Sequence, residues 1–173
     1  MGWYYRRLES GLVVMHARPE HAEQLEALQL VCFPTLADEE RFKARHYRKH
    51  LEVFAAGQFV VLDGDRVVGA TATIRLPFDF EHVGHTFGEI IQGGWLTSHD
   101  PAGDWLYGAD IGVHPDYRGQ GLAAALYAIV IVTFVFQVAR VEGLSMAPTL
   151  DDLMRDVANA HATNVDCHCL SSM

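Results

Sequence analysis

The residue types and spacing best suited to chemistry in this chain form a loop between a strand and a helix. Arg118-Gly119-Gln120-Gly121 contains two glycines and precedes a run of strong helix formers, Leu122-Ala123-Ala124-Ala125-Leu126. Glycines let a bound group approach the main chain closely, and the first turn of a helix presents N–H groups without partners inside the helix. The same end of a helix favours negative charge. The spacing therefore predicts an anion site, with phosphate as the natural occupant.

A strand is predicted directly before this loop. Apolar and small or polar residues alternate there with period two: Tyr107, Ala109, Ile111 and Val113 against Gly108, Asp110 and Gly112. His114-Pro115-Asp116 then ends the strand, because proline lacks a donor for the ladder and restricts the residue before it. We expect a strand with one apolar face that leads into the anion site.

Together these residues resemble motif A of the GNAT superfamily of N-acetyltransferases. In that motif a strand ending in Val is followed by a short loop and by R/Q-x-x-G-x-G/A at the start of a helix, and the corresponding residues here are Val113, Arg118, Gly119, Gln120, Gly121 and Ala123. The resemblance implies a GNAT-like mixed central sheet flanked by helices, of the α/β class. It also implies acetyl-coenzyme A as co-substrate and an amine, on a small molecule or a protein, as acetyl acceptor.

The resemblance further implies where the coenzyme binds. Main-chain N–H groups from Arg118 to Ala123 would hold the pyrophosphate, and the splayed end of the strand, Ile111 to Val113, would pair with the pantetheine arm. The expected coenzyme-binding residues are therefore Ile111, Gly112, Val113, Arg118, Gly119, Gln120, Gly121, Leu122 and Ala123.

Two carboxylates are candidates for the base that removes the proton of the attacking amine. Asp110 lies on the strand that would present the thioester, three residues before Val113, where many members of the superfamily carry an acidic residue. Glu89 would reach the acceptor side of the cleft if Phe87 to Gln92 enters the sheet. For each, a plain surface carboxylate remains the alternative. No metal site is expected.

The elements upstream are predicted from local patterns. Leu12 to Ala17 favours a strand, and Arg18-Pro19-Glu20 starts a helix whose apolar stripe is followed by Pro34. The stripe consists of Ala22, Leu25, Leu28 and Val31. A second helix is expected from Asp38 to Phe54, and two strands, Phe59 to Leu62 and Val67 to Leu76, flank the hairpin signal Asp63-Gly64-Asp65-Arg66. This order of elements is that of the GNAT superfamily.

The resemblance weakens after Tyr127. Ile129 to Phe136 is apolar on every face and rich in β-branched residues, so helix and strand readings conflict. We therefore expect an acetyl-coenzyme A-binding domain over residues 1–140 and an atypical tail over 141–173, which leaves the fold incomplete or atypical at its C-terminus.

Composition excludes several classes of partner. The chain has 173 residues and a formal net charge of -9, which disfavours nucleic acid. The acidity suits a cationic amine, or serves only solubility. The apolar run Leu122 to Phe136 is shorter than the roughly 20 residues of a membrane span, so no membrane partner is expected. The start lacks the apolar segment of a secretion signal, which predicts a cytoplasmic protein.

Two other functions remain open from the residues. The chain could bind acyl-coenzyme A without turning it over. Less favoured is a dinucleotide-binding protein, because Gly119 to Ala124 also fits G-x-G-x-x-A and Glu142 follows at a suitable distance for a ribose. Against that reading, His114 to Arg118 separates the strand from the first glycine, and a hairpin precedes the strand.

Overall fold

The computed structural model describes residues 4–77 and 86–139. It contains two compact units, which meet in sequence between Arg118 and Gly119, and each is described separately. The tail expected over residues 141–173 lies outside the described residues.

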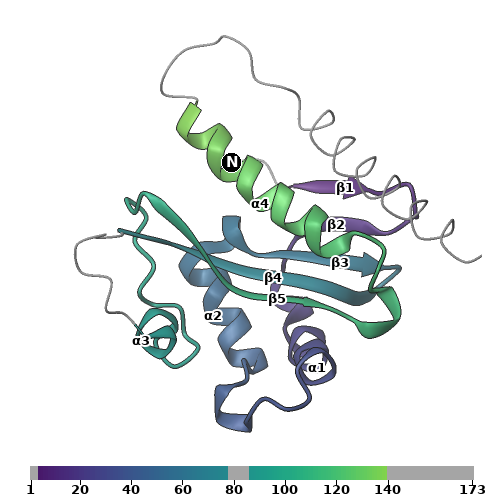
Figure 1. The fold of residues 1–173 in the computed structure, drawn as a ribbon, viewed down its shortest axis with the longest axis horizontal. Helices are drawn as coiled ribbons and strands as arrows, with labels where there is room; N and C mark the ends of the chain where they lie inside the picture. Colours follow the sequence, from purple (N-terminus) through teal and green to yellow (C-terminus); the bar gives the residue numbers. More distant parts are fainter. Residues whose placement is uncertain (1–3, 78–85, 140–173) are drawn as a thin grey trace, which may run out of the picture. The chain divides into compact units, whose positions relative to one another are not determined.

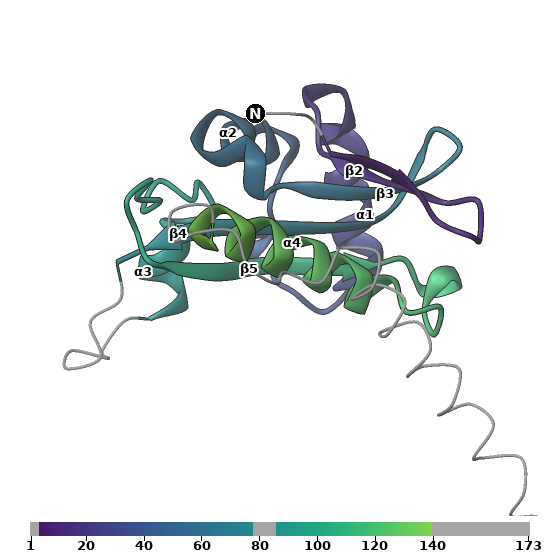
Figure 2. The same cartoon turned by 90° about the horizontal axis from the view of Figure 1, so that it is seen from above.

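The first unit is built on one antiparallel sheet of five strands in the order β1-β2-β3-β4-β5. Figure 2 shows β5 along one edge of this sheet. The strands are β1 (Tyr5–Arg7), β2 (Val13–His16), β3 (Phe59–Asp63), β4 (Arg66–Leu76) and β5 (Trp105–Val113). The sequence predicted all but β1, which is too short to carry a periodic signal.

Two helices cover one face of the sheet, α1 (Ala22–Cys32) and α2 (Ala44–Phe54) (Figure 1). The apolar stripe of α1 is buried at Ala22, Leu25 and Leu28 and joins the core of the unit. Val31, expected in the same stripe, is 44% exposed because it lies in the last turn of the helix.

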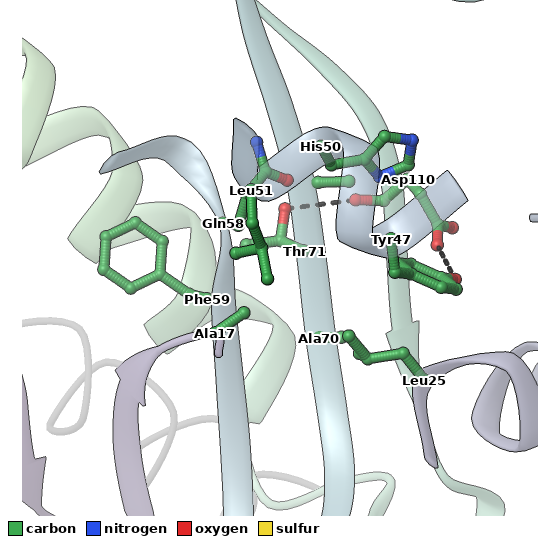
Figure 3. A pocket seen from close by; sticks show the side chains of 11 residues that line it. Ala17, Leu25, Tyr47, His50, Leu51, Gln58, Phe59, Ala70, Thr71 and Asp110 are labelled. Atoms are coloured by element: carbon green, nitrogen blue, oxygen red, sulfur yellow. Dashed lines mark hydrogen bonds between the residues drawn. The ribbon is translucent and has the colours of Figure 1, made fainter. Parts of the chain in front are cut away.

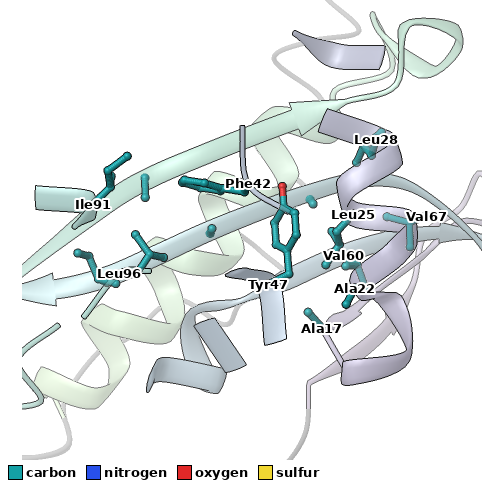
Figure 4. Close-up of a cluster of buried hydrophobic side chains, with 14 of the residues drawn as sticks. Ala17, Ala22, Leu25, Leu28, Phe42, Tyr47, Val60, Val67, Ile91 and Leu96 are labelled. Carbon is teal, nitrogen blue, oxygen red and sulfur yellow. The ribbon is translucent and has the colours of Figure 1, made fainter. Parts of the chain in front are cut away.

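The core of the first unit fills the space between these helices and the sheet (Figure 4). Val60 on β3 and Ile74 on β4 are completely buried. Phe42 and Tyr47 add large aromatic side chains from the α2 region, and their rings meet edge to face at 5.9 Å. The core thus holds α2 firmly against the strands that carry the candidate site.

The expectation of one helix from Asp38 to Phe54 is wrong. A 3₁₀ turn, Asp38–Glu40, is followed by an extended segment, and α2 begins only at Ala44. Side chains of α1 cause the break: the amide oxygen of Gln29 accepts from the N–H of Phe42, and the carboxylate of Glu26 accepts from the N–H of Ala44 at 2.8 Å. These bonds replace the helical ones that the segment would otherwise make.

The condition that placed Glu89 near the site is also wrong. Phe87 to Gln92 does not enter the sheet; the segment forms a short helix, α3 (Phe87–Ile91). Thr86 and Glu89 cap this helix reciprocally: the Thr86 hydroxyl accepts from the Glu89 N–H at 3.3 Å, and the Glu89 carboxylate accepts from the Thr86 N–H at 2.8 Å. Thr-x-x-Glu is the sequence signature of such a cap, so the pattern at residues 86–89 indicates a helix start rather than a strand.

The described part of the second unit consists of the glycine loop and one helix, α4 (Leu122–Ala139). The conflict over Ile129 to Phe136 is therefore resolved as helix, since the alanine-rich start nucleates a helix that the β-branched residues continue. Leu122, Leu126 and Ile129 recur at helical spacing and are buried, whereas Tyr127 and Ile131 are exposed. Over residues 4–77 and 86–139, no helix combines the length and apolarity needed to cross a membrane.

Candidate functional site

The candidate site begins with a bulge in β5. Ala72 of β4 is paired with Asp110, and Thr73, the next residue of β4, is paired with Gly108, so Ala109 is the extra residue. The strict alternation expected along β5 is wrong at this point. Beyond the bulge the side chains exchange faces, and Asp110 lies on the same face as the buried Ala72, beneath α1 and α2.

The bulge places the carboxylate of Asp110 among polar side chains from both helices. The phenolic hydroxyl of Tyr47 on α2 donates to Oδ2 of Asp110 at 3.5 Å, as Figure 3 shows. The Gln29 amide on α1 donates to the same oxygen at 3.4 Å. The Thr71 hydroxyl on β4 donates to the main-chain carbonyl of Asp110 at 3.1 Å, which fixes the backbone of the bulge.

Burial changes the acidity of this group. It raises the pKa of Asp110 from 3.8 to about 6, although hydrogen bonds from Tyr47, the Ile111 N–H and Gln29 favour the ionised form and oppose the rise. Burial, together with the neighbouring Asp110, also raises the pKa of Tyr47 well above its ordinary value. Asp110 is therefore a carboxylate that exchanges a proton near neutral pH, as a general base requires, while Tyr47 stays protonated and can only donate to it.

The residues that support Asp110 were missed in the sequence. Gln29 is four residues after Leu25 and belongs to the buried side of α1, where a polar residue is itself a signal. Tyr47 and His50 lie on the inward side of α2 at helical spacing, but the helix is rich in charged residues and its buried side chains are mostly aromatic and polar. A search for aliphatic stripes overlooks such a helix.

The second candidate base is placed differently. Glu89 is exposed, and its carboxylate also accepts from the Thr86 hydroxyl at 2.9 Å. In the structure it caps the start of α3. Of the two carboxylates, Asp110 is the one that is desolvated.

The predicted pantetheine edge is the end of β5. Ile111, Gly112 and Val113 pair with Thr71, Ala70 and Gly69 of β4, and among the described strands β5 has no partner on its other side. Gly112 has a packing reason as well, because a Cβ there would lie 3.2 Å from the sulfur of Cys32 on α1. The outer edge of β5 can therefore accept an extended ligand through main-chain hydrogen bonds.

The loop after β5 has the backbone shape that its sequence indicates. A 3₁₀ turn at Pro115–Tyr117 leads to Arg118, whose Nε donates to the carbonyl of Val113 at 3.2 Å. Gly119 and Gly121 then adopt φ values of +78° and +74°, in the left-handed region that favours glycine.

The N–H groups that follow point to an anion site. Gly119, Gln120 and Ala123 are exposed, and among the described residues no main-chain carbonyl accepts a hydrogen bond from the N–H groups of residues 120–124. Ala125 is the first to return to the helical pattern, donating to Gly121 at 2.9 Å. Donors in this arrangement are available to a phosphate.

Comparison with protein families identifies one match. The profile of the acetyltransferase (GNAT) family matches residues 22–153 and so extends beyond α4, past Tyr127, where the resemblance by motif weakens. The antiparallel pairing of all described strands also agrees with this family and not with the parallel β-α-β unit that a dinucleotide-binding protein requires.

Two curated relatives come from Bacillus subtilis. The probable hydrolase YhcX is 31% identical over 121 residues, which cover 70% of this chain and 23% of that protein. The uncharacterized N-acetyltransferase YkwB is 28% identical over 118 residues, covering 68% of this chain and 52% of the relative. The chain therefore spans about a quarter of one relative and about half of the other.

Two solved structures share the fold. The GphF GNAT-like decarboxylase in complex with isobutyryl-CoA aligns with a TM-score of 0.59 and 25% identity, over 69% of this chain and 57% of the other. The loading GNATL domain of CurA from Lyngbya majuscula aligns with a TM-score of 0.58 and 19% identity, over 75% and 57% of the two chains. The latter supports the fold alone.

Proposed function

The chain belongs to the acetyltransferase (GNAT) family, and we propose that it transfers an acetyl group from acetyl-coenzyme A to an amine. The environment of Asp110 is the observation that carries this proposal. This carboxylate lies on the strand that leads into the glycine loop, and desolvation raises its pKa to about 6. Asp110 is half-buried between two polar helix residues, and desolvation there disfavours its ionised form, which an ordinary surface carboxylate would not show.

In this proposal the main chain binds the coenzyme. The pyrophosphate accepts hydrogen bonds from N–H groups of Gly119 to Ala123, and the guanidinium of Arg118 adds positive charge. The amides of the pantetheine arm pair with the open edge of β5 at Ile111 to Val113. No described main-chain carbonyl accepts from the N–H groups of residues 120–124, and no described strand pairs with the outer edge of β5.

In the proposed chemical step the protein positions the reactants and accepts a proton. The amine nitrogen attacks the thioester carbonyl carbon and Asp110 takes the proton that the nitrogen releases. The new C–N bond forms as the C–S bond breaks, and coenzyme A leaves as a thiolate that takes up a proton. The carboxylate acts in its ionised form, so the reaction is expected to accelerate as the pH rises through about 6. Tyr47 and Gln29 act through Asp110 by holding its carboxylate and are positioning residues.

Ligand binding and turnover test the proposal separately. Acetyl-coenzyme A is expected to raise the melting temperature of the protein by mass action, whereas NAD is not. Thiol release in the presence of a panel of amines then measures transfer. Stabilisation without release for any amine would favour the alternative function, an acyl-coenzyme A-binding module without catalysis. An absence of stabilisation would contradict both.

The proposal also specifies the acyl group as acetyl. The GphF relative was solved with isobutyryl-CoA, so the same titration with isobutyryl-coenzyme A shows whether the chain prefers a branched acyl group. Equal or stronger stabilisation by isobutyryl-coenzyme A would contradict the acetyl specificity proposed here and leave the acyl-coenzyme A site intact.

A further inference from the structure

His50 on α2 has one ring nitrogen with a partner and one without. The side chain is 1% exposed, and its Nε2 lies 2.7 Å from the main-chain carbonyl of Gly94. A carbonyl oxygen can only accept, so Nε2 carries the proton. In the neutral ring Nδ1 is then a bare acceptor, and it is buried without a hydrogen-bond partner among the described residues. Leaving such a group unsatisfied costs the folded state its desolvation penalty.

The ring stays neutral, which preserves this arrangement. Burial lowers the pKa of His50 to about 4, and the nearby His46 acts in the same direction. At neutral pH Nδ1 therefore keeps its lone pair and needs a donor.

His50 shares a small pocket with the candidate base. Tyr47, Thr71 and Asp110 line the same pocket, and Figure 3 shows the His50 ring beside them. Ala70 and Ala72 leave the floor of the pocket free of bulky side chains. The pocket has a volume of about 10 Å³, which is the lower limit of the room that one water requires.

We infer that this pocket holds one ordered water, which donates one hydrogen bond to Nδ1 of His50 and the other to the carboxylate of Asp110. The water satisfies the buried nitrogen, which no described protein group reaches. It also adds a donor to Asp110, whose two side-chain donors, Tyr47 and Gln29, converge on the same oxygen. A water needs two or more polar partners to remain in such a place, and the pocket supplies them.

The water gives His50 a positioning role toward the base. A donor to the carboxylate favours its ionised form, so the water keeps the pKa of Asp110 lower than a dry pocket would. The other titratable groups around this cluster are Tyr47, Cys32, Glu26 and His46. If Asp110 is the base of the proposed acetyl transfer, His50 helps to set the pH at which that base becomes active; this second step rests on the proposed function.

A high-resolution crystal structure of the full chain without ligand tests the water directly. The expected result is a density peak within hydrogen-bond distance of both His50 Nδ1 and an Asp110 carboxylate oxygen. An empty pocket, or a protein group bonded to Nδ1, would overturn the inference.

Two substitutions test the two ring nitrogens of His50 one at a time. In His50→Gln the amide nitrogen occupies roughly the place of Nε2, so the bond to Gly94 is retained and the acceptor for the water is lost. In His50→Asn the amide oxygen occupies roughly the place of Nδ1, so the acceptor is retained and the bond to Gly94 is lost. Carboxyl ¹³C titration by NMR is expected to show the pKa of Asp110 raised by about one unit in the Gln variant only.

Equal Asp110 pKa values in both variants and the wild type would also overturn the inference. Neither readout uses coenzyme A or an amine. A dry pocket with intact acetyl transfer therefore rejects the water alone, and a hydrated pocket without transfer rejects only the proposed function.

Discussion

The hydroxyl of Tyr47 on α2 donates to the carboxylate of Asp110 on β5, although the two residues are separated by 63 positions in the sequence. The bond requires two irregularities. Because of the break before it, α2 begins at Ala44, which places Tyr47 on the inward side of the helix. The bulge at Ala109 turns Asp110 toward that helix. The pair therefore depends on two departures from regular secondary structure.

Replacing the carboxylate tests its role as base. Asp110→Asn is expected to lower kcat/KM for acetyl transfer by about 10²- to 10⁴-fold, because the amide cannot accept the amine's proton. Binding of acetyl-coenzyme A, measured by calorimetry, is expected to stay unchanged. Asp104→Asn, at an exposed carboxylate just before β5, is the matched control. Full activity in Asp110→Asn would reject Asp110 as the base.

Removing the phenolic hydroxyl tests how Asp110 is tuned. The hydrogen bond from Tyr47 lowers the pKa of Asp110, so Tyr47→Phe is expected to raise it. The acidic limb of the kcat/KM profile against pH should move to higher pH by up to about one unit, with little change on the plateau. A loss of activity at all pH values, without a shift of the limb, would instead indicate a packing defect.

The desolvation of Asp110 also predicts a pH dependence of stability. Asp110 binds its proton more tightly in the folded state, with a pKa of about 6, than in the unfolded state, near 3.8. Between these values the folded state holds the extra proton, so the contribution of Asp110 to the free energy of unfolding falls as the pH rises from about 4 to 6. Above pH 6 its ionisation is a net cost.

Asp110→Asn removes that cost. The variant is expected to be more stable than the wild type by about 1 to 3 kcal/mol at pH 8, and the difference should disappear below about pH 4. Urea unfolding of both proteins across this range measures it. His50, whose pKa is lowered to about 4, makes the free energy of unfolding rise with pH. Because both proteins contain His50, its contribution cancels in the difference between them. An Asn variant less stable at pH 8 than at pH 4, relative to wild type, would contradict the sign.

The glycine loop offers a test with a matched backbone. Gly119 and Gly11 both have left-handed φ values, +78° and +87°, and both have open space where a Cβ would lie. Valine at either position strains the backbone by roughly the same 1 to 2 kcal/mol. Gly119→Val is expected to weaken acetyl-coenzyme A binding at least tenfold, whereas Gly11→Val lowers the melting temperature only. Equal binding by the two variants would show that the loop does not hold the coenzyme.

Local sequence patterns were sufficient to predict many of the strands, turns and loop conformations of this protein. The hairpin of β3 and β4, the end of β5 before Pro115 and the left-handed glycines at 119 and 121 follow from turn chemistry and period-two alternation. Each depends on residues adjacent in sequence, so the sequence determined them alone. The family resemblance followed from the same short segment.

The environment of Asp110 depended on the tertiary structure. Alternation along β5 would place Tyr107 and Ile111 on one face and Asp110 on the other, but a single unpaired residue, Ala109, exchanges the faces. Gln29 both breaks the second helix at Phe42 and donates to Asp110. No local pattern contains such contacts, because the bonds that create them compete with regular secondary structure and form only between segments that folding brings together.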